Sequence, residues 1–257
     1  MKKQYLLLAS LLFGIIFTEI FDQQTAQAAD HLNLEEGLPT EVEDAYPVPY
    51  QGRELQGVLR YDRTGDGKDH FVVEPRLEYG FAPNWQGRIA IPFEFGSDTA
   101  DGIGDVEVEV FHNFNTETLK MPAFAVSASA AFPTGADSAG VDPSFKFIAT
   151  KTLGTGANLD RVHLNLGYSI NTSAEEEERG DRISAVVGYS RRLNSETILV
   201  TDLAYEQEQE KDQDSLLLEM GVRYQRSPLN VIAIGAGVGL TEDSPDFRVT
   251  AGFQRSF

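Results

Sequence analysis

The chain contains no cysteine, and only four of its 257 residues are histidines. Without cysteine it has no disulfide framework, no thiolate metal ligand and no cysteine for a lipid anchor. The histidines His31, His70, His112 and His163 are not spaced like the ligands of a metal-binding motif. From these residue types we expect no metal site and no cofactor.

Basic residues are also scarce: 21 lysines and arginines stand against 40 aspartates and glutamates, a formal net charge of −19. Such a chain is a poor partner for nucleic acid, because phosphates require a basic surface. Beyond residue 28 no apolar run approaches the roughly 20 residues of a transmembrane helix. Any residence in a membrane would therefore require a β-barrel, in which every second strand residue meets lipid.

The first 28 residues resemble a secretory signal peptide. Lys2 and Lys3 precede an apolar stretch over residues 5–20, and Ala-Gln-Ala at 26–28 is a small-x-small cleavage site. An uncleaved membrane anchor is the alternative, but the stretch is shorter than the roughly 20 residues that span a bilayer. We predict a cleaved signal over residues 1–28, which exports the mature chain.

Residues 53–257 consist of alternating apolar and polar positions separated by turn residues. Leu216, Leu218 and Met220, for example, alternate with polar positions such as Glu219 and, further on, Arg223. A period of two predicts strands with one apolar face. Segments of roughly 9–13 residues are long enough to cross a bilayer when tilted. The pattern predicts an all-β fold, a transmembrane antiparallel up-and-down β-barrel of about 12 strands.

The connections between these segments fall into two classes that alternate along the chain. Bacterial barrels place short turns in the periplasm and longer polar loops outside. A soluble β-sandwich would also show alternating strands but does not predict this sorting. An even number of strands would return both ends of the barrel to the periplasm. The tight connections lie at 83–84, 116–120, 153–160, 193–195 and 227–228, and the charged ones at 62–68, 97–103, 134–140, 173–180, 206–214 and 242–245.

The last segment resembles the terminal strand of bacterial outer-membrane barrels. Phe247, Val249 and Phe253 share its apolar face, and the chain ends at Phe257. In those proteins this strand is the signal bound by the barrel-assembly machinery, so Phe253 and Phe257 are the predicted assembly signal. Arg255 departs from the pattern. We expect the cell outer membrane of a Gram-negative bacterium as the location, with membrane lipids and lipopolysaccharide as neighbours.

Charged residues of both signs occupy the predicted inward face of the barrel. Paired, they would plug the lumen with salt bridges; unpaired, they would line a water-filled path, and their acidic excess would favour cations or neutral solutes. Residues 29–52, rich in proline and acidic residues, form a leader that lies in the periplasm, in the lumen or without fixed structure. The lumen-lining candidates are Glu74, Arg76, Glu78, Arg88, Glu94, Glu107, Glu109, Lys146, Arg182, Asp202, Glu219, Arg223 and Arg248.

One class of enzyme shares the predicted architecture, the outer-membrane phospholipases, with a lipid-facing histidine and serine on one strand. His112 is on the predicted lipid face, but Phe114 stands two residues away and no serine follows at the required spacing. A hydroxyl nucleophile needs its base within hydrogen-bond reach. We therefore predict no catalytic residues. The acidic run from Glu175 to Glu178 is expected to be a solvated loop, with divalent-cation binding next to lipopolysaccharide as the alternative.

Three short motifs occur in the order found in a known family. They are Val-Glu-Asp-Ala-Tyr-Pro at 42–47, Gly-Ile-Gly-Asp at 102–105 and Phe-Pro-Thr-Gly at 132–135. With these motifs the chain resembles the meta-pathway phenol-degradation family of outer-membrane proteins. The resemblance implies a small outer-membrane barrel that passes small hydrophobic or aromatic compounds. We expect a channel or transporter for passive passage of small solutes; the alternative is a closed structural or adhesive barrel with acidic surface loops.

Overall fold

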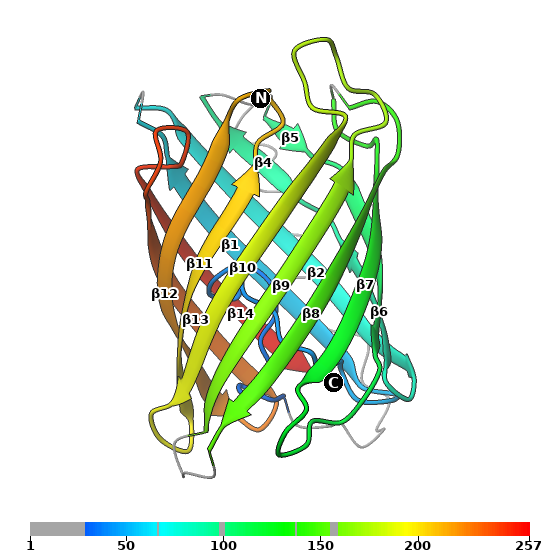
Figure 1. Cartoon of the computed structure of the whole chain (residues 1–257), viewed down its shortest axis with the longest axis vertical. Helices are drawn as coiled ribbons and strands as arrows, with labels where there is room; N and C mark the ends of the chain where they lie inside the picture. The colour runs from blue at the N-terminus through cyan, green and yellow to red at the C-terminus, as the bar shows by residue number, and fades with distance from the viewer. Residues whose placement is uncertain (1–28, 66, 98–100, 137, 155–158) are drawn as a thin grey trace.

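The alternating residues form one continuous antiparallel sheet in the computed structural model, which describes residues 29–257 except 66, 98–100, 137 and 155–158 (Figure 1). The predicted signal peptide lies outside the described residues. No helix among the described residues is long and apolar enough to cross a membrane. The strands are β1 (Arg53–Arg63), β2 (Asp69–Ala82), β3 (Trp85–Ala90), β4 (Phe93–Gly96), β5 (Gly102–Ile103), β6 (Val106–Asn113), β7 (Ala123–Phe132), β8 (Asp142–Leu153), β9 (Asp160–Ile170), β10 (Asp181–Arg192), β11 (Thr197–Gln207), β12 (Asp214–Ser227), β13 (Asn230–Gly239) and β14 (Phe247–Ser256).

These 14 strands make twelve crossings of a closed barrel. Strands β3 and β4 both pair with β2 and are separated by Ile91 and Pro92, so together they form the third crossing. Likewise β5 pairs with β4 and β6 pairs with β3, which makes the fourth. The sheet closes because β14 pairs with β1, from Glu54 opposite Ser256 to Arg63 opposite Phe247. The prediction of an antiparallel barrel with about 12 strands is confirmed.

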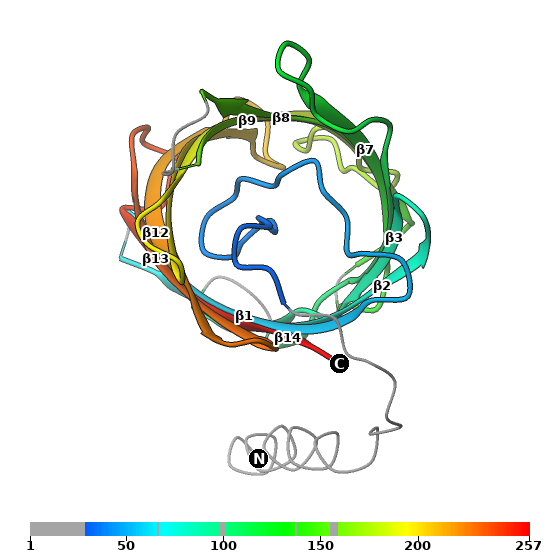
Figure 2. The same cartoon turned by 90° about the horizontal axis from the view of Figure 1, so that it is seen from below.

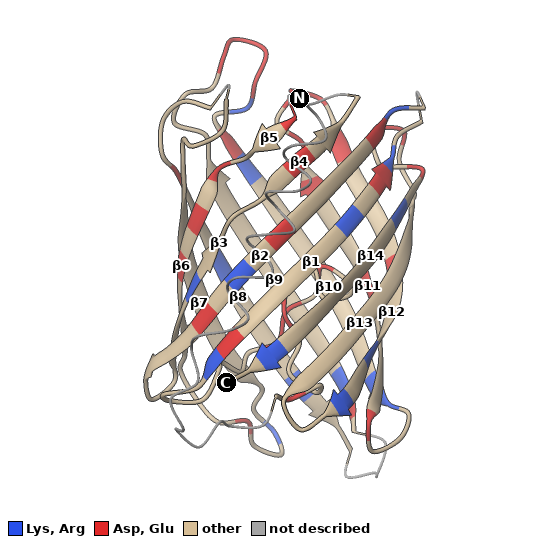
Figure 3. Ribbon diagram, turned by 180° about the vertical axis from the view of Figure 1, so that it is seen from behind, with Lys and Arg blue, Asp and Glu red and all other residues tan. Residues whose placement is uncertain are grey.

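The two predicted classes of connection lie at opposite ends of the barrel. We call the end that contains Arg53 and Ser256 the turn end, and the opposite end the loop end. Four of the five turn-end connections are six residues or fewer, and acidic residues are frequent in the loops of the opposite end (Figure 3). The connection at 114–122 is longer than the predicted 116–120. Within it the Glu117 carboxylate accepts hydrogen bonds from Tyr46 and Thr152.

The outer surface of the barrel is apolar. On β12 the outward side chains Leu218 and Met220 are 46% and 58% exposed, whereas the inward neighbours Glu219 and Gly221 are buried. A continuous apolar surface of this extent is not left to water, so this face is suited to lipid. Alternation therefore sends apolar side chains to the bilayer and polar side chains to the lumen.

Aromatic side chains gather on the outer surface at the turn end. Trp85 stacks on His112 with ring centroids 4.0 Å apart, and Phe81 and Phe114 flank the pair at 6.1 and 5.0 Å. Amphipathic rings at this height are typical of the interfacial girdle of a membrane barrel. His112 is thus part of an aromatic cluster, with its Nδ1 3.2 Å from the carbonyl oxygen of Asn84.

The last strand closes the barrel with an aromatic side chain set against a glycine. A Cβ built on Gly57 would lie 2.5 Å from the ring of Phe253, its partner across the seam between β1 and β14. The amide of Phe257 donates a hydrogen bond to the carbonyl of Arg53 at 3.1 Å. Both residues predicted as the assembly signal therefore lie at the closing seam.

A charge placed on the lipid-facing surface tests the membrane assignment. Met220, in the middle of β12, faces outward, and Leu240 follows the last residue of β13 at the loop end. We expect Met220→Arg to lower the free energy of unfolding in lipid vesicles by about 2–4 kcal/mol, against about 0–1 kcal/mol for Leu240→Arg. Denaturant titration in vesicles measures both, and equal effects of the two variants would contradict a lipid-facing belt.

Candidate functional site in the barrel lumen

The leader, residues 29–52, lies inside the barrel as a loop (Figure 2). It begins at the turn end, where the amide of Ala29 donates to the carbonyl of Pro228 at 2.8 Å. It ends at the same rim, where the amide of Gln51 donates to the carbonyl of Gly80 at 2.7 Å. Between these points Leu34 and Leu38 are each 1% exposed. The leader is thus as buried as the core of a soluble protein.

Inward-facing apolar residues receive the apolar side chains of the leader. Leu34 and Val42 pack against a patch that includes Ile198, Val200 and Leu217. This patch and two others interrupt the polar inner face where the leader covers it, so apolar burial holds the leader against the wall. The other two patches are Phe111, Ala123, Ala125 and Ile148 around Ala45, and Val58 with Ala233 around Leu38.

Inward-facing glycines make room for the leader. A Cβ on Gly188 would lie 2.5 Å from Val42 Cγ2, and a Cβ on Gly252 would lie 2.3 Å from Leu38 Cδ2. On β12, a Cβ at Gly221 would lie 2.5 Å from Cγ of Pro39. Real Cβ atoms do not approach this closely, so the shape of the wall is complementary to the leader.

The amide groups of the leader bond to side chains of the wall, because the leader is not a strand of the sheet. The amides of Val42 and Glu43 donate to Asp202 Oδ2 and Asn165 Oδ1, both at 2.8 Å. The amide of Ala45 donates to Thr150 Oγ1 at 3.0 Å. A buried amide without a partner would cost free energy, so these wall side chains are needed to seat the leader.

Arg223 anchors the leader through backbone carbonyl groups. This fully buried guanidinium donates to the carbonyl oxygens of Leu38 and His31, at 2.8 and 3.2 Å, and to Gln254 on β14. Three of its donors thus join two points of the leader to the wall. A planar guanidinium suits this task because its donors are held in a fixed fork.

Lys146 forms ion pairs with two leader carboxylates at once. Its Nζ lies 2.7 Å from Glu36 Oε2 and 2.9 Å from Glu43 Oε2. Burial disfavours both charges, but Lys146, helped by Arg88 at 3.6 Å, outweighs burial at Glu36 and holds its pKa at about 2. At Glu43 burial prevails over Lys146, with nearby Glu109 adding to it, and the pKa rises to about 7.

Two further carboxylates, Glu41 and Asp44, form ion pairs in the middle of the leader. Glu41 Oε1 lies 2.6 Å from Arg248 Nη1 and 3.0 Å from Arg60 Nη2. Asp44 lies 3.7 Å from Arg161, but burial raises the pKa of Asp44 to about 7. The leader therefore carries both ionised and proton-binding carboxyl groups inside the lumen.

The structure divides the thirteen lumen-lining candidates by their distance from the leader. Arg76, Arg88, Lys146, Asp202, Glu219, Arg223 and Arg248 contact the leader directly. Glu107 and Glu109 pair with Arg88, Glu74 pairs with Arg76, and Glu78 lies beside Glu35. Glu94 and Arg182 face His70 and Glu206, at 3.6 and 3.9 Å, nearer the loop end.

Sequence reasoning missed the apolar patches and the glycines that receive the leader. Two sequence signals point to them. Ile198, Leu199 and Val200 are apolar on both faces of β11, and β13 carries a run of small inward residues, Ala233, Gly235, Gly237 and Gly239. Both patterns depart from strict apolar-polar alternation, and both occur where something other than water occupies the lumen.

One histidine lies inside the barrel. His163 is buried between Thr150 and Ser190, with Nδ1 3.1 Å from Thr150 Oγ1 and Nε2 3.0 Å from Ser190 Oγ. The serine and threonine are themselves 0% exposed, so solvent reaches none of the three. Their mutual hydrogen bonds satisfy buried polar groups behind the leader.

Comparison with known proteins agrees with this architecture. A family model described as "Putative MetA-pathway of phenol degradation" matches residues 31–257. An outer-membrane channel from Pseudomonas putida F1 superposes with a TM-score of 0.66 at 12% identity, over 88% of this chain and 100% of that one. The NanC porin gives 0.57 at 11% identity (80% and 100% covered), and the KdgM porin 0.54 at 9% (79% and 99%). A search of the curated proteins gives no match.

These similarities are those of a fold, and the fold is that of an outer-membrane barrel. The closed twelve-strand sheet and its apolar exterior place the chain in the outer membrane, as predicted. The family expected from the three short motifs is likewise confirmed.

Removal of the Arg223 guanidinium tests its role as an anchor. Arg223→Met would leave the carbonyls of His31 and Leu38 buried without a donor, at a cost of about 1–3 kcal/mol each. We expect the leader amides to exchange with solvent deuterium about ten-fold faster or more. Arg226→Met, on the exposed side of the same strand, is the matched control. Unchanged exchange at Val42 in Arg223→Met would contradict the assignment.

The raised pKa values of Glu43 and Asp44 predict that docking of the leader depends on pH. Their pKa values rise from ordinary values of 4.5 and 3.8 to about 7 on burial. Both groups therefore take up protons when the leader docks, and this stabilisation is full below about 4 and lost as the pH rises through about 7. The charged groups that face them are Lys146, Arg88, Glu109, Glu36, Arg161 and Asp30.

Exchange protection factors of the leader amides, which divide out the intrinsic exchange rate, measure this dependence. We expect them to be lower at pH 8.5 than at pH 5.5. Asp44→Asn should flatten the profile, because one of the two titrating groups is removed. Protection that rises with pH in the unmodified chain would contradict the sign of the prediction.

Proposed function

The chain belongs to the phenol-degradation family that matches residues 31–257, and on that premise we propose that it is an outer-membrane channel for small solutes, closed at rest by its own leader. The observation that carries the proposal is the position of residues 29–52 inside the lumen (Figure 2). The leader is held there by hydrogen bonds, ion pairs and small apolar patches. None of these contacts is covalent, so the leader can leave.

The orientation follows from the two classes of connection. Short turns face the periplasm in bacterial barrels, which assigns the turn end to the periplasm and the acidic loops to the outside. The leader would then enter the lumen from the periplasmic side. Phe257 would lie at the periplasmic rim, where the barrel-assembly machinery would bind it.

The geometry of the leader supports the proposal that it is a plug that can withdraw from the lumen. Both of its ends contact the turn end, through Pro228 and Gly80, so it can withdraw without passing through the barrel. Its withdrawal would uncover the inward patches around Ile198 and Phe111 beside charged residues such as Arg88. A lumen with both apolar and charged walls suits small solutes that have an apolar or aromatic body and a polar group.

The acidic side chains in the part of the lumen nearest the loop end support a preference for solutes of a particular charge. There Glu94, Glu107 and Glu206 are partly or fully exposed, and they face His70, Arg88 and Arg182 in that order. An acidic entrance favours cations and neutral molecules over anions. We therefore propose neutral or cationic small compounds, hydrophobic or aromatic in part, as the transported class.

A permanently closed structural barrel is the second candidate. The ion pairs of Glu41 with Arg248 and of Glu43 with Lys146, at 2.6 and 2.9 Å, favour it because withdrawal of the leader would break them. Whether the leader leaves the lumen distinguishes the two functions. The absence of cysteine from the chain makes a disulfide lock a direct test.

The lock joins Val42 in the leader to Gly188 on β10. A Cβ at Gly188 would lie 2.9 Å from Val42 Cβ, so a small shift reaches the roughly 3.5–4.5 Å of a disulfide. In planar bilayers we expect Val42→Cys/Gly188→Cys to show discrete conductance steps when reduced and none when oxidised. Val42→Cys alone, the control, should not respond to the oxidant.

A variant that lacks residues 33–48 completes the test. We expect persistent conductance, and swelling of proteoliposomes faster in neutral aromatic solutes than in anionic ones of equal size. A sealed bilayer with this variant, whose barrel is shown to be folded, would contradict the channel and favour the structural barrel.

A further inference from the structure

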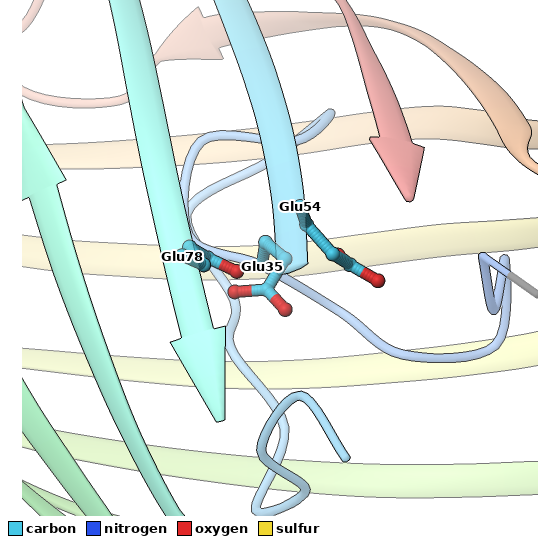
Figure 4. Close-up of side chains that lie close together, drawn as sticks. All are labelled: Glu35, Glu54 and Glu78. Atoms are coloured by element: carbon cyan, nitrogen blue, oxygen red, sulfur yellow. The ribbon is translucent and has the colours of Figure 1, made fainter. Parts of the chain in front are cut away.

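Three buried carboxylates meet where the leader, β1 and β2 come together. Figure 4 shows Glu35 of the leader between Glu54 of β1 and Glu78 of β2. One carboxylate oxygen from each lies within 4.8 Å of the other two. The residues are 2%, 5% and 0% exposed. Water therefore does not reach this cluster to screen three like charges.

The hydrogen-bond donors around the cluster are neutral. Asn33 donates to Glu35 at 3.0 Å, Gln56 to Glu78 at 2.9 Å and Ser256 to Glu54 at 3.0 Å. Across the described part of the chain, no lysine, arginine or histidine nitrogen comes within 4.0 Å of these three carboxylates, and Arg223 is directed to Gln254 and to leader carbonyls. Arg88, across the sheet from Glu78, and Arg223 act on the cluster only from beyond 4.0 Å, so no cation of the described chain contacts it.

A second observation points to a missing ligand. Glu78 is fully buried, and its Oε1 has no hydrogen-bond partner among the described residues, although the carboxylate points toward Glu35 (Figure 4). The amide oxygen of Gln56, which is also 0% exposed, likewise has no partner. The Gln56 oxygen is an acceptor only, and so is the Glu78 oxygen while its carboxylate is ionised. A buried acceptor without a partner is costly, and a cation satisfies it.

The spacing of the oxygens allows one shared cation, and the coordination geometry that each cation requires distinguishes calcium from magnesium. An ion centred among three oxygens no more than 4.8 Å apart lies at most about 2.8 Å from each. Calcium binds oxygen at about 2.3–2.6 Å with flexible geometry, whereas magnesium requires about 2.0–2.1 Å and a near-ideal octahedron. We propose that Glu35, Glu54 and Glu78 form a calcium site that ties the leader to the wall, with the Gln56 amide oxygen and water as further ligands.

Such an ion would tie the leader to β1 and β2, which already pair with each other in the barrel ladder. Because Glu35 belongs to the leader, the complete site exists only while the leader is docked. Calcium would then stabilise the docked state by mass action. This consequence for channel opening rests on the proposed function, whereas the binding of calcium by the chain does not.

Calorimetric titration of the folded full chain with calcium chloride, after removal of divalent ions by a chelator, tests the site. We expect one calcium ion bound per chain, and magnesium bound at least ten-fold more weakly. Glu35→Gln and Glu78→Gln should each weaken calcium binding by at least ten-fold. Glu196→Gln, in the exposed turn between β10 and β11, removes one carboxylate elsewhere and should leave binding unchanged.

No calcium binding by the folded chain, or equal binding in Glu35→Gln, would overturn the proposal. The former result would mean that bound protons neutralise the cluster instead. Glu35 lies outside the strands, so its variant decides the question even if Glu78→Gln does not fold. Calcium binding together with a sealed leaderless barrel would retain the site and reject the channel.

Discussion

The closed ladder of backbone hydrogen bonds is the constraint on which the rest of this structure depends. Lipid offers no partner for a backbone amide, so a spanning sheet must have no free edge. Pairing of β1 with β14 meets this condition. Once the ladder is closed, alternation along each strand has only one outcome, in which one set of side chains contacts lipid and the other faces a common interior.

That interior is too polar to collapse on itself and too wide for its side chains alone to fill. The leader solves both problems at once. Its amides take the wall acceptors Asp202, Asn165 and Thr150, while Lys146 and Arg248 neutralise its acidic side chains. Since most of these contacts are polar, docking is specific without a large apolar area, and it responds to pH and to ions.

The sequence predicts the barrel far better than it predicts the site. Strand positions depend on a local period of two, so segments such as residues 214–227 are recognisable without knowledge of their neighbours. The contacts of the leader have no period, and they join residues far apart in the chain, such as Val42 with Asp202 and Glu43 with Asn165. The inward charges were predicted as a set, but their partners were not, because the path of the leader decides which carboxylate Lys146 meets.

Both ends of the leader lie at the same rim of the barrel, beside Pro228 and Gly80. A loop that enters and leaves a ring of strands on the same side does not require a chain end to be threaded through that ring. The ring can therefore close first, around water, and receive residues 29–52 afterwards. The order of folding events is left free, and the last native contacts to form can be those between Leu38, Val42 and the glycines that receive them.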